Sequence, residues 1–280
     1  MIERVARSPW TRLVAGLAAM IALYVPILAA LVRAWASAPS LAHGFVVPLI
    51  SAYLVWGRRR DLAPMALAPS LIGLPFLLSG LFLYVIGTLA GEPFVARWSF
   101  IVSLAGLILF LAGGAVTRAL LPAVGYLALM IPAPYVTLRG LTDWLRGIEA
   151  TTAAWTLPLL GVPVFQDGFL LHLPNMTLEV AEVCSSIPAI ISLLALGAAL
   201  GYVTRRPPTV HIALILAAVP LGFLSNIARI TLTAMGVHYV GPIVLQNALH
   251  TWHGAMVFVM TMGALSLLDT GLMRLRLDPR

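Results

Sequence analysis

Residues 179–188 read Glu179-Val-Ala-Glu182-Val-Cys184-Ser-Ser-Ile-Pro188, and the organisation of the whole chain can be worked out from them. This stretch contains the only cysteine, with two acids before it, and leads directly into an apolar run that reaches about residue 203. Polar groups at the end of a membrane helix are costly unless they are paired or hydrated. The stretch therefore indicates a functional cluster at one membrane surface.

The composition is typical of a polytopic membrane protein. Of the 280 residues, 61% are hydrophobic and 10% are charged, and the mean hydropathy is +1.00. Soluble domains are closer to half apolar and a quarter charged. We therefore expect an all-α polytopic membrane protein whose apolar surface is solvated mainly by membrane lipid.

The positive charge marks one side of the membrane. The net charge is +7, and all 17 basic residues are arginines. A basic chain can indicate a nucleic-acid partner, but these arginines lie in short loops, as they do on the cytoplasmic side of membrane proteins. The strongest marker is the run Arg58–Arg60. We expect no nucleic-acid partner, an inner (cytoplasmic) membrane protein, and cytoplasmic N and C termini.

Eight apolar segments alternate with the arginine-rich loops. About twenty helical residues, at about 1.5 Å each, cross a hydrocarbon core of about 30 Å. The predicted membrane helices cover about residues 13–35, 42–57, 69–90, 98–114, 116–132, 186–203, 209–235 and 249–272. One membrane domain over residues 1–280 is sufficient for this pattern.

Residues from about 135 to 182 differ from the rest and are predicted to form an extracytoplasmic insertion. In Thr137–Leu160, charged residues recur every three or four positions against apolar ones, which predicts an amphipathic helix at the outer interface. The charged positions are Arg139, Asp143, Arg146 and Glu149. Residues 162–180 are rich in β-formers and contain the turn signals Asp167-Gly168 and Pro174-Asn175, so short strands in a β-hairpin are expected.

The alternation places Cys184, Arg229 and His250 at the outer ends of three successive helices. A thiolate is the attacking form of cysteine, and a helix N-terminus and a nearby cation both favour it. Ser185 or Ser186 is expected to cap the helix that follows Cys184. His250 can take and return a proton, and Arg229 can stabilise an oxyanion. The three residues therefore indicate an acyl-transfer site on the extracytoplasmic side.

Three further residues are candidates for assisting roles. Asn226 lies one helical turn before Arg229, Glu182 can orient a cation near the thiol, and His253 competes with His250 as the base. Each main residue also has an ordinary structural interpretation. A single cysteine in an apolar chain is usually a small buried side chain, an arginine can reach the headgroups, and a histidine at a helix end can be interfacial.

The sequence contains no zinc-binding spacing such as His-Glu-x-x-His and no phosphate-binding glycine loop. We therefore expect neither a metal nor another cofactor.

At these residues the chain resembles the exosortase/archaeosortase family of membrane cysteine transpeptidases. The motifs that carry the resemblance are Glu182-Val-Cys184-Ser185-Ser186, Asn226-Ile-Ala-Arg229 and His250-Thr-Trp-His-Gly254, in the order the family has them. Ser186 stands where the family usually has glycine, and Pro188 where a polar or basic residue is common. The resemblance implies that Cys184 is the nucleophile, Arg229 the stabilising cation and His250 the acid/base, with His250 favoured over His253 by the position of Gly254.

The resemblance also implies a substrate class: secreted proteins with a C-terminal sorting signal, made of a Pro-Glu-Pro-like motif, one membrane helix and a basic tail. Cleavage would occur on the outer face, and the acceptor is open between water, a lipid and a glycan. Two other interpretations are a transporter and a non-catalytic scaffold for envelope or exopolysaccharide assembly. A transporter should show repeats and broken helices near the midplane, whereas the polar residues here lie at the outer edge.

Overall fold

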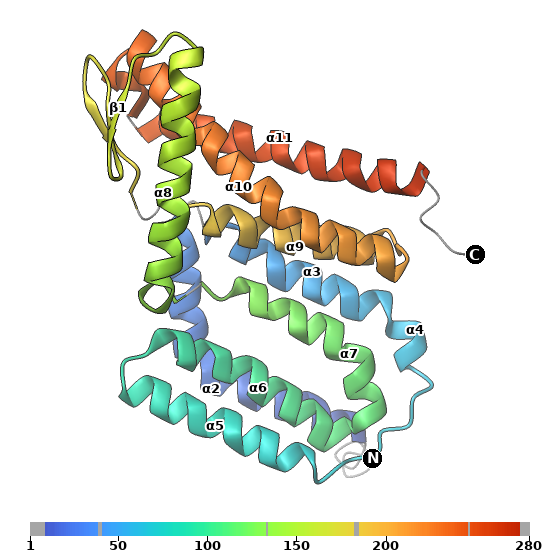
Figure 1. The fold of residues 1–280 in the computed structure, drawn as a ribbon. Coiled ribbons are helices and arrows are strands. Elements are labelled where there is room, and N and C mark those ends of the chain that lie inside the picture. Colours follow the sequence, from blue (N-terminus) through green and yellow to red (C-terminus); the bar gives the residue numbers. More distant parts are fainter. Residues whose placement is uncertain (1–8, 39–40, 133, 182–184, 246, 275–280) are drawn as a thin grey trace. The chain divides into compact units, whose positions relative to one another are not determined.

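A computed structural model describes residues 9–38, 41–132, 134–181, 185–245 and 247–274, and the chain forms two compact units, Met1–Ala133 and Pro134–Arg280 (Figure 1). Both units are built mainly of helices. The prediction of one membrane domain over residues 1–280 stays a prediction.

The first unit consists of helices. They are α2 (Pro9–Ser37), α3 (His43–Gly57), α4 (Arg59–Leu62), α5 (Gly73–Leu89), α6 (Pro93–Ala112), α7 (Gly114–Tyr126) and the 3-10 helix η2 (Leu127–Met130). A polar contact ties two of them together: the buried hydroxyl of Tyr24 on α2 lies 3.1 Å from Ser99 Oγ and 2.9 Å from Ser103 Oγ on α6. Such contacts stabilise helix pairs in a membrane, where no water competes for the hydroxyls.

Glycines allow α5 and α6 to approach backbone to backbone. A Cβ placed on Gly106 would lie 2.4 Å from the backbone nitrogen of Leu77, and one on Gly80 would lie 2.6 Å from that of Ser103. Helices in membranes depend on such small residues because lipid provides no hydrophobic force between them. A larger side chain at position 106 would therefore collide with the backbone at Leu77 and push the two helices apart.

We expect Gly106→Ala to destabilise the first unit by about 1–3 kcal/mol, because the new methyl group must push α5 away from α6. Thermal unfolding of the purified protein in detergent measures this change. Gly125→Ala on α7 is the matched control, because a Cβ at Gly125 meets nothing within 4 Å. Equal melting temperatures for the two variants would contradict the packing argument.

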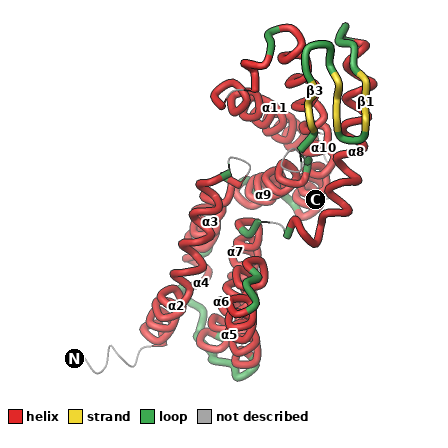
Figure 2. The backbone as a smooth tube through the Cα atoms, turned by 90° about the vertical axis from the view of Figure 1, so that its left-hand side faces the viewer, coloured by secondary structure: helices red, strands yellow, loops and turns green. Residues whose placement is uncertain are grey.

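The second unit combines helices with a small sheet. Its elements are α8 (Tyr135–Leu159), β1 (Phe165–Asp167), β2 (Leu170–His172), β3 (Thr177–Glu179), α9 (Ile187–Val203), α10 (Pro208–Tyr239), the 3-10 helix η4 (Pro242–Leu245) and α11 (Asn247–Arg274). The sheet is antiparallel with the order β1-β2-β3 (Figure 2). In its register, Leu171 pairs with Gln166 of β1 and with Leu178 of β3. The predicted amphipathic helix and hairpin are confirmed as secondary structure, and a third strand extends the hairpin.

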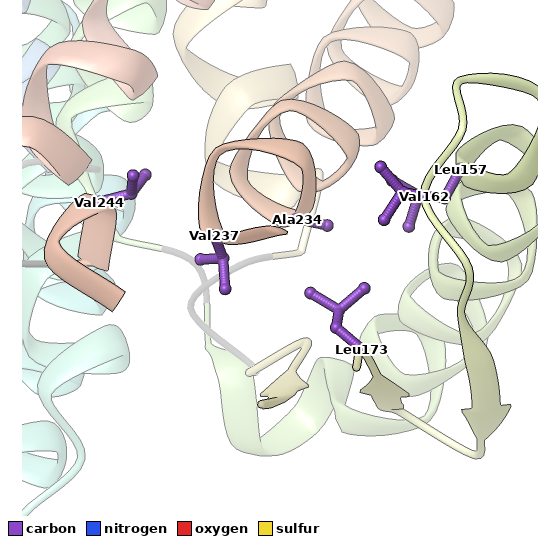
Figure 3. Close-up of a cluster of buried hydrophobic side chains, with 6 residues drawn as sticks. All are labelled: Leu157, Val162, Leu173, Ala234, Val237 and Val244. Atoms are coloured by element: carbon purple, nitrogen blue, oxygen red, sulfur yellow. The ribbon is translucent and has the colours of Figure 1, made fainter. Parts of the chain in front are cut away.

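The sheet and α8 pack on the C-terminal half of α10. Ala234 and Val237 of α10 lie among Leu157, Val162 and Leu173, as Figure 3 shows. A neighbouring buried cluster is formed by Ala150, Ala153, Leu171, Val180 and Ile230. The insertion is thus joined to α10 by an apolar core.

The opposite half of α10 packs on α9 and α11. Leu193, Val210, Leu214, Ala218 and Leu265 form a buried cluster there. Beside it, Arg206 donates to both carboxylate oxygens of the buried Asp269, at 2.8 and 2.6 Å. The turn between α9 and α10 is therefore tied to α11 by a two-pronged ion pair.

Each of the eight predicted membrane segments coincides with a helix of the described chain. Within the residues that the structure describes, three helices are long and apolar enough to cross a membrane: Trp10–Ser37, Pro93–Ala112 and Pro208–Tyr239. Shorter apolar helices span His43–Gly57, Gly73–Leu89, Gly114–Met130 and Ile187–Val203. The chain is thus an α-helical membrane protein, and the number of eight crossings stays a prediction. Several boundaries differ from the prediction: α6 begins at Pro93, the α-helix α7 ends at Tyr126 and is followed by η2, and α10 continues to Tyr239, past the predicted end at residue 235.

Candidate active site

The described residues include only part of the predicted triad. Cys184 and Glu182 lie outside the described residues. His250 and His253 belong to α11, but their side chains are outside the described part. Arg229 and Asn226 are described, both on α10. The convergence of Cys184, Arg229 and His250 therefore stays a prediction. The structure does describe the contacts of Arg229 and of the chain before and after Cys184.

Helix α8 turns part of its charged face into the protein. Arg146 is 5% exposed and Glu149 is fully buried, whereas Trp144 is 62% exposed and Trp155 is 76% exposed. An inward charge on a helix is costly unless it is paired, so the partners of Arg146 and Glu149 show what these charges do.

Arg146 holds the chain just after β3. Its Nε donates a hydrogen bond of 2.8 Å to the carbonyl oxygen of Val180, and its Nη1 donates one of 3.0 Å to Asp143. The guanidinium also lies over the ring of Phe169, 4.1 Å from the centroid. A planar guanidinium that is fixed on several sides is a rigid anchor. Val180 lies four positions before Cys184.

Glu149 holds the chain just after Cys184. Its Oε1 accepts a hydrogen bond of 3.2 Å from the backbone N–H of Ser186, which precedes α9. Its Oε2 accepts a hydrogen bond of 2.7 Å from Nδ2 of Asn226 on α10. Burial raises the pKa of Glu149, and this rise is opposed by the hydrogen bonds from Ser186 and Asn226 and by the positive charge of Arg229.

The start of α9 differs from the prediction. Ser186 occupies the N-cap position, but it makes no side-chain capping hydrogen bond, and the buried hydroxyl of Ser185 has no partner among the described residues. The expected serine cap is therefore wrong at Ser186. A carboxylate from α8 takes an N–H at this helix end instead, as an acid does at a helix N-terminus.

Arg229 borders a small cavity beside the sheet. The cavity has a volume of about 80 Å³ and is lined mainly by apolar side chains. Its lining includes Glu179 and Val180, from the chain that ends β3, and Arg229 and Ile230 of α10. Nη2 of Arg229 is buried and has no hydrogen-bond partner within the described part of the chain. A buried guanidinium donor without a hydrogen-bond partner is costly, because the loss of its hydration is not compensated.

The functional interpretation of the sequence did not include Arg146 and Glu149, although it placed both on an amphipathic helix. Their spacing already carried information: Arg139, Asp143, Arg146 and Glu149 form a stripe of charges on a helix in a very apolar chain. In a membrane protein, such a stripe tends to face the protein interior, because lipid cannot solvate it. Of these four residues, Arg146 and Glu149 face the protein interior here.

Comparison with known proteins places the chain in a family. No curated protein and no solved structure gives a significant match. The family model of the transmembrane exosortases matches residues 35–267, which is most of the chain and includes the three motifs around Cys184, Arg229 and His250. The chain therefore belongs to the transmembrane exosortase family.

Proposed function

We propose that this protein is a membrane-embedded cysteine transpeptidase or protease that cleaves the C-terminal sorting signal of secreted proteins through a thioester at Cys184. The observation that supports the proposal is that Nη2 of Arg229 is buried without a hydrogen-bond partner among the described residues, and that Arg229 lines a cavity together with Glu179 and Val180, a few residues before Cys184 in the sequence. A cation donor beside a chain that carries a nucleophile is the arrangement that acyl transfer requires.

Each residue has one task in the proposed reaction. His250 takes the proton of the Cys184 thiol, and the thiolate attacks the carbonyl carbon of the scissile peptide, so that a carbon–sulfur bond forms. Arg229 donates to the oxyanion of the tetrahedral intermediate. The carbon–nitrogen bond then breaks, and His250 returns the proton to the leaving amine. The thioester is resolved by water or by a hydroxyl or amine of an acceptor, which gives hydrolysis or transpeptidation.

The site is proposed to lie on the extracytoplasmic side of the inner membrane. Arg205 and Arg206 precede α10, and Arg229 lies 21 residues after Pro208, where that helix begins. At about 1.5 Å per residue this separation is about 30 Å, close to the thickness of the hydrocarbon core. Arginines at the first end are typical of the cytoplasmic side, which supports a position of Arg229 at the outer surface, where a motif just outside a substrate's membrane helix can reach it.

Mass spectrometry of a candidate substrate tests the proposal. A secreted protein with a Pro-Glu-Pro-like motif, a membrane helix and a basic tail is expressed with and without this protein. We expect a new C-terminus at the motif only when the protein is present. A mass equal to that of the free acid indicates water as the acceptor, and an added mass identifies a lipid or glycan. An unprocessed tail in both samples would contradict the proposal for that substrate class.

His250 and His253 provide a matched pair for the base. We expect His250→Ala to lower the rate of processing by about 10²–10⁴-fold, the usual range for loss of a general acid/base. His253→Ala is expected to stay within about threefold of the wild type. The two variants are compared by the initial rate of product formation at equal amounts of folded protein. The reverse order of the two rates would assign the base to His253.

A further inference from the structure

One turn of α8 holds the chain on both sides of Cys184. Arg146 and Glu149 are three residues apart and therefore lie on the same side of the helix. Arg146 binds the carbonyl of Val180, and Glu149 binds the N–H of Ser186. Cys184 lies between these two anchor points in the sequence. The ends of the segment that carries the cysteine are thus attached to a single rigid element.

The Glu149 carboxylate also reaches the helix that carries Arg229. Its second oxygen accepts from Asn226, one turn before Arg229, and the charge of Arg229 acts on the carboxylate. Glu149 is fully buried and Asn226 is 3% exposed. One carboxylate therefore joins three elements: α8, the start of α9 and the end of α10 that carries the cation.

A carboxylate is a costly way to hold helices together. Well-packed apolar residues often stabilise a buried position as well as an ion pair or better, and α8 already packs on α10 through Ala150 and Ala153. Hydrogen bonds differ from apolar contacts because they specify direction and register. The use of Glu149 at this point therefore suggests that the relative placement of α9 and α10 matters.

We propose that Glu149 is a positioning residue for the reaction: its carboxylate fixes the start of α9, next to Cys184, against the Asn226–Arg229 turn of α10. The proposal rests on the proposed function of Cys184 and Arg229. Glu149 acts through these residues and does not itself contact the substrate.

An isosteric exchange of the carboxylate and the amide tests this role. Asn226→Asp alone puts a second carboxylate where Oε2 of Glu149 accepts a 2.7 Å hydrogen bond, and like charges at this distance repel strongly. Glu149→Gln alone removes the negative charge. When the glutamine oxygen accepts from Ser186, its NH₂ group faces the NH₂ group of Asn226, so Asn226 must turn its oxygen toward the glutamine. This turn also disturbs the further interaction that Asn226 makes. In the double variant Glu149→Gln/Asn226→Asp, the glutamine oxygen accepts from Ser186 and its nitrogen donates to the new carboxylate. The two hydrogen bonds that the Glu149 carboxylate accepts from Ser186 and Asn226 are thus each replaced.

We expect kcat for substrate processing to fall by about 100-fold or more in Asn226→Asp and about 10-fold in Glu149→Gln, with KM nearly unchanged. The double variant is expected to return to within about fivefold of the wild type. Alkylation of Cys184 by N-ethylmaleimide gives a second measurement without substrate, because the chain has no other thiol. The rate of alkylation should change in both single variants and recover in the double variant.

Asp269→Asn is the matched control, since it neutralises another buried carboxylate in the same unit, the partner of Arg206. This control should lower the melting temperature and leave kcat and the alkylation rate of folded protein unchanged. Single variants with wild-type kcat, or a double variant no faster than Glu149→Gln, would overturn the positioning role. The comparison of the double variant with Glu149→Gln can still be made if Asn226→Asp alone fails to fold.

The parallel variant Cys184→Ala separates this inference from the function on which it rests. Product formation in Cys184→Ala would contradict the proposed function itself. If Cys184→Ala is inactive while the Glu149 and Asn226 variants keep the wild-type rate, the positioning role is contradicted and the proposed function is not.

Discussion

Cys184→Ala is expected to lower the rate of substrate processing by at least about 10³-fold, as removal of a covalent nucleophile does in other hydrolases. The variant cannot form a thioester, so neither the cleaved substrate nor a transferred product should appear. Cys184→Ser is expected to be inactive as well, because a hydroxyl group at neutral pH is a far weaker nucleophile than a thiolate. The measurement is the amount of new substrate C-terminus formed per folded protein.

Ser185→Ala is the control for this experiment. Ser185 is the next residue along the chain, is 2% exposed, and its hydroxyl has no hydrogen-bond partner among the described residues. Its loss should therefore change the rate by less than about threefold. A Cys184→Ala protein that still trims its substrate would mean that the thiol is an ordinary buried side chain.

Arg229→Gln should lower kcat by about 10²–10³-fold, the cost of losing one donor to an oxyanion. Arg229→Lys keeps the positive charge but loses the planar fork of donors, and it is expected to recover only part of this loss. Because Glu149 lies within the electrostatic reach of Arg229, Arg229→Gln also leaves a buried carboxylate with less compensation. The melting temperature must therefore be measured beside the rate.

Arg60→Gln is the control for a loss of positive charge as such. Arg60 is exposed on α4, at the arginine run expected on the cytoplasmic side. Its substitution should leave kcat within about threefold of the wild type. Equal losses of rate in Arg60→Gln and Arg229→Gln would show that total charge matters, and would remove the argument for an oxyanion role.

The helices of the chain could be predicted because their length and composition depend on local sequence. An apolar run bounded by arginines or by glycine and proline forms a helix in a membrane almost irrespective of what surrounds it, since every backbone group must be paired within the segment. The exact ends of the helices could not be predicted in the same way. For example, α10 continues to Tyr239, because residues 236–239 can extend the helix and Val237 gains burial against the sheet.

The direction in which α8 faces could not be predicted from its pattern. Periodicity indicates which residues share a side of a helix, but it does not indicate whether that side meets water, lipid or protein. Arg146 has a local partner in Asp143, but the other hydrogen bonds of Arg146 and Glu149 are to Val180, Ser186 and Asn226, which are 34, 37 and 77 positions away. No local rule connects residues at such separations.

The sequence by itself therefore determined the membrane class of this protein, its succession of helices, and the three motifs that identify an exosortase. These features follow from hydropathy, chain length and short residue spacings, all of which are local properties. Only the tertiary structure showed that the buried Glu149 joins the start of α9 to the Asn226–Arg229 turn, and that a buried donor of Arg229, a residue that lines a cavity, has no partner in the described part of the chain. Burial and hydrogen-bond pairing depend on which distant segments pack together, and folding decides that.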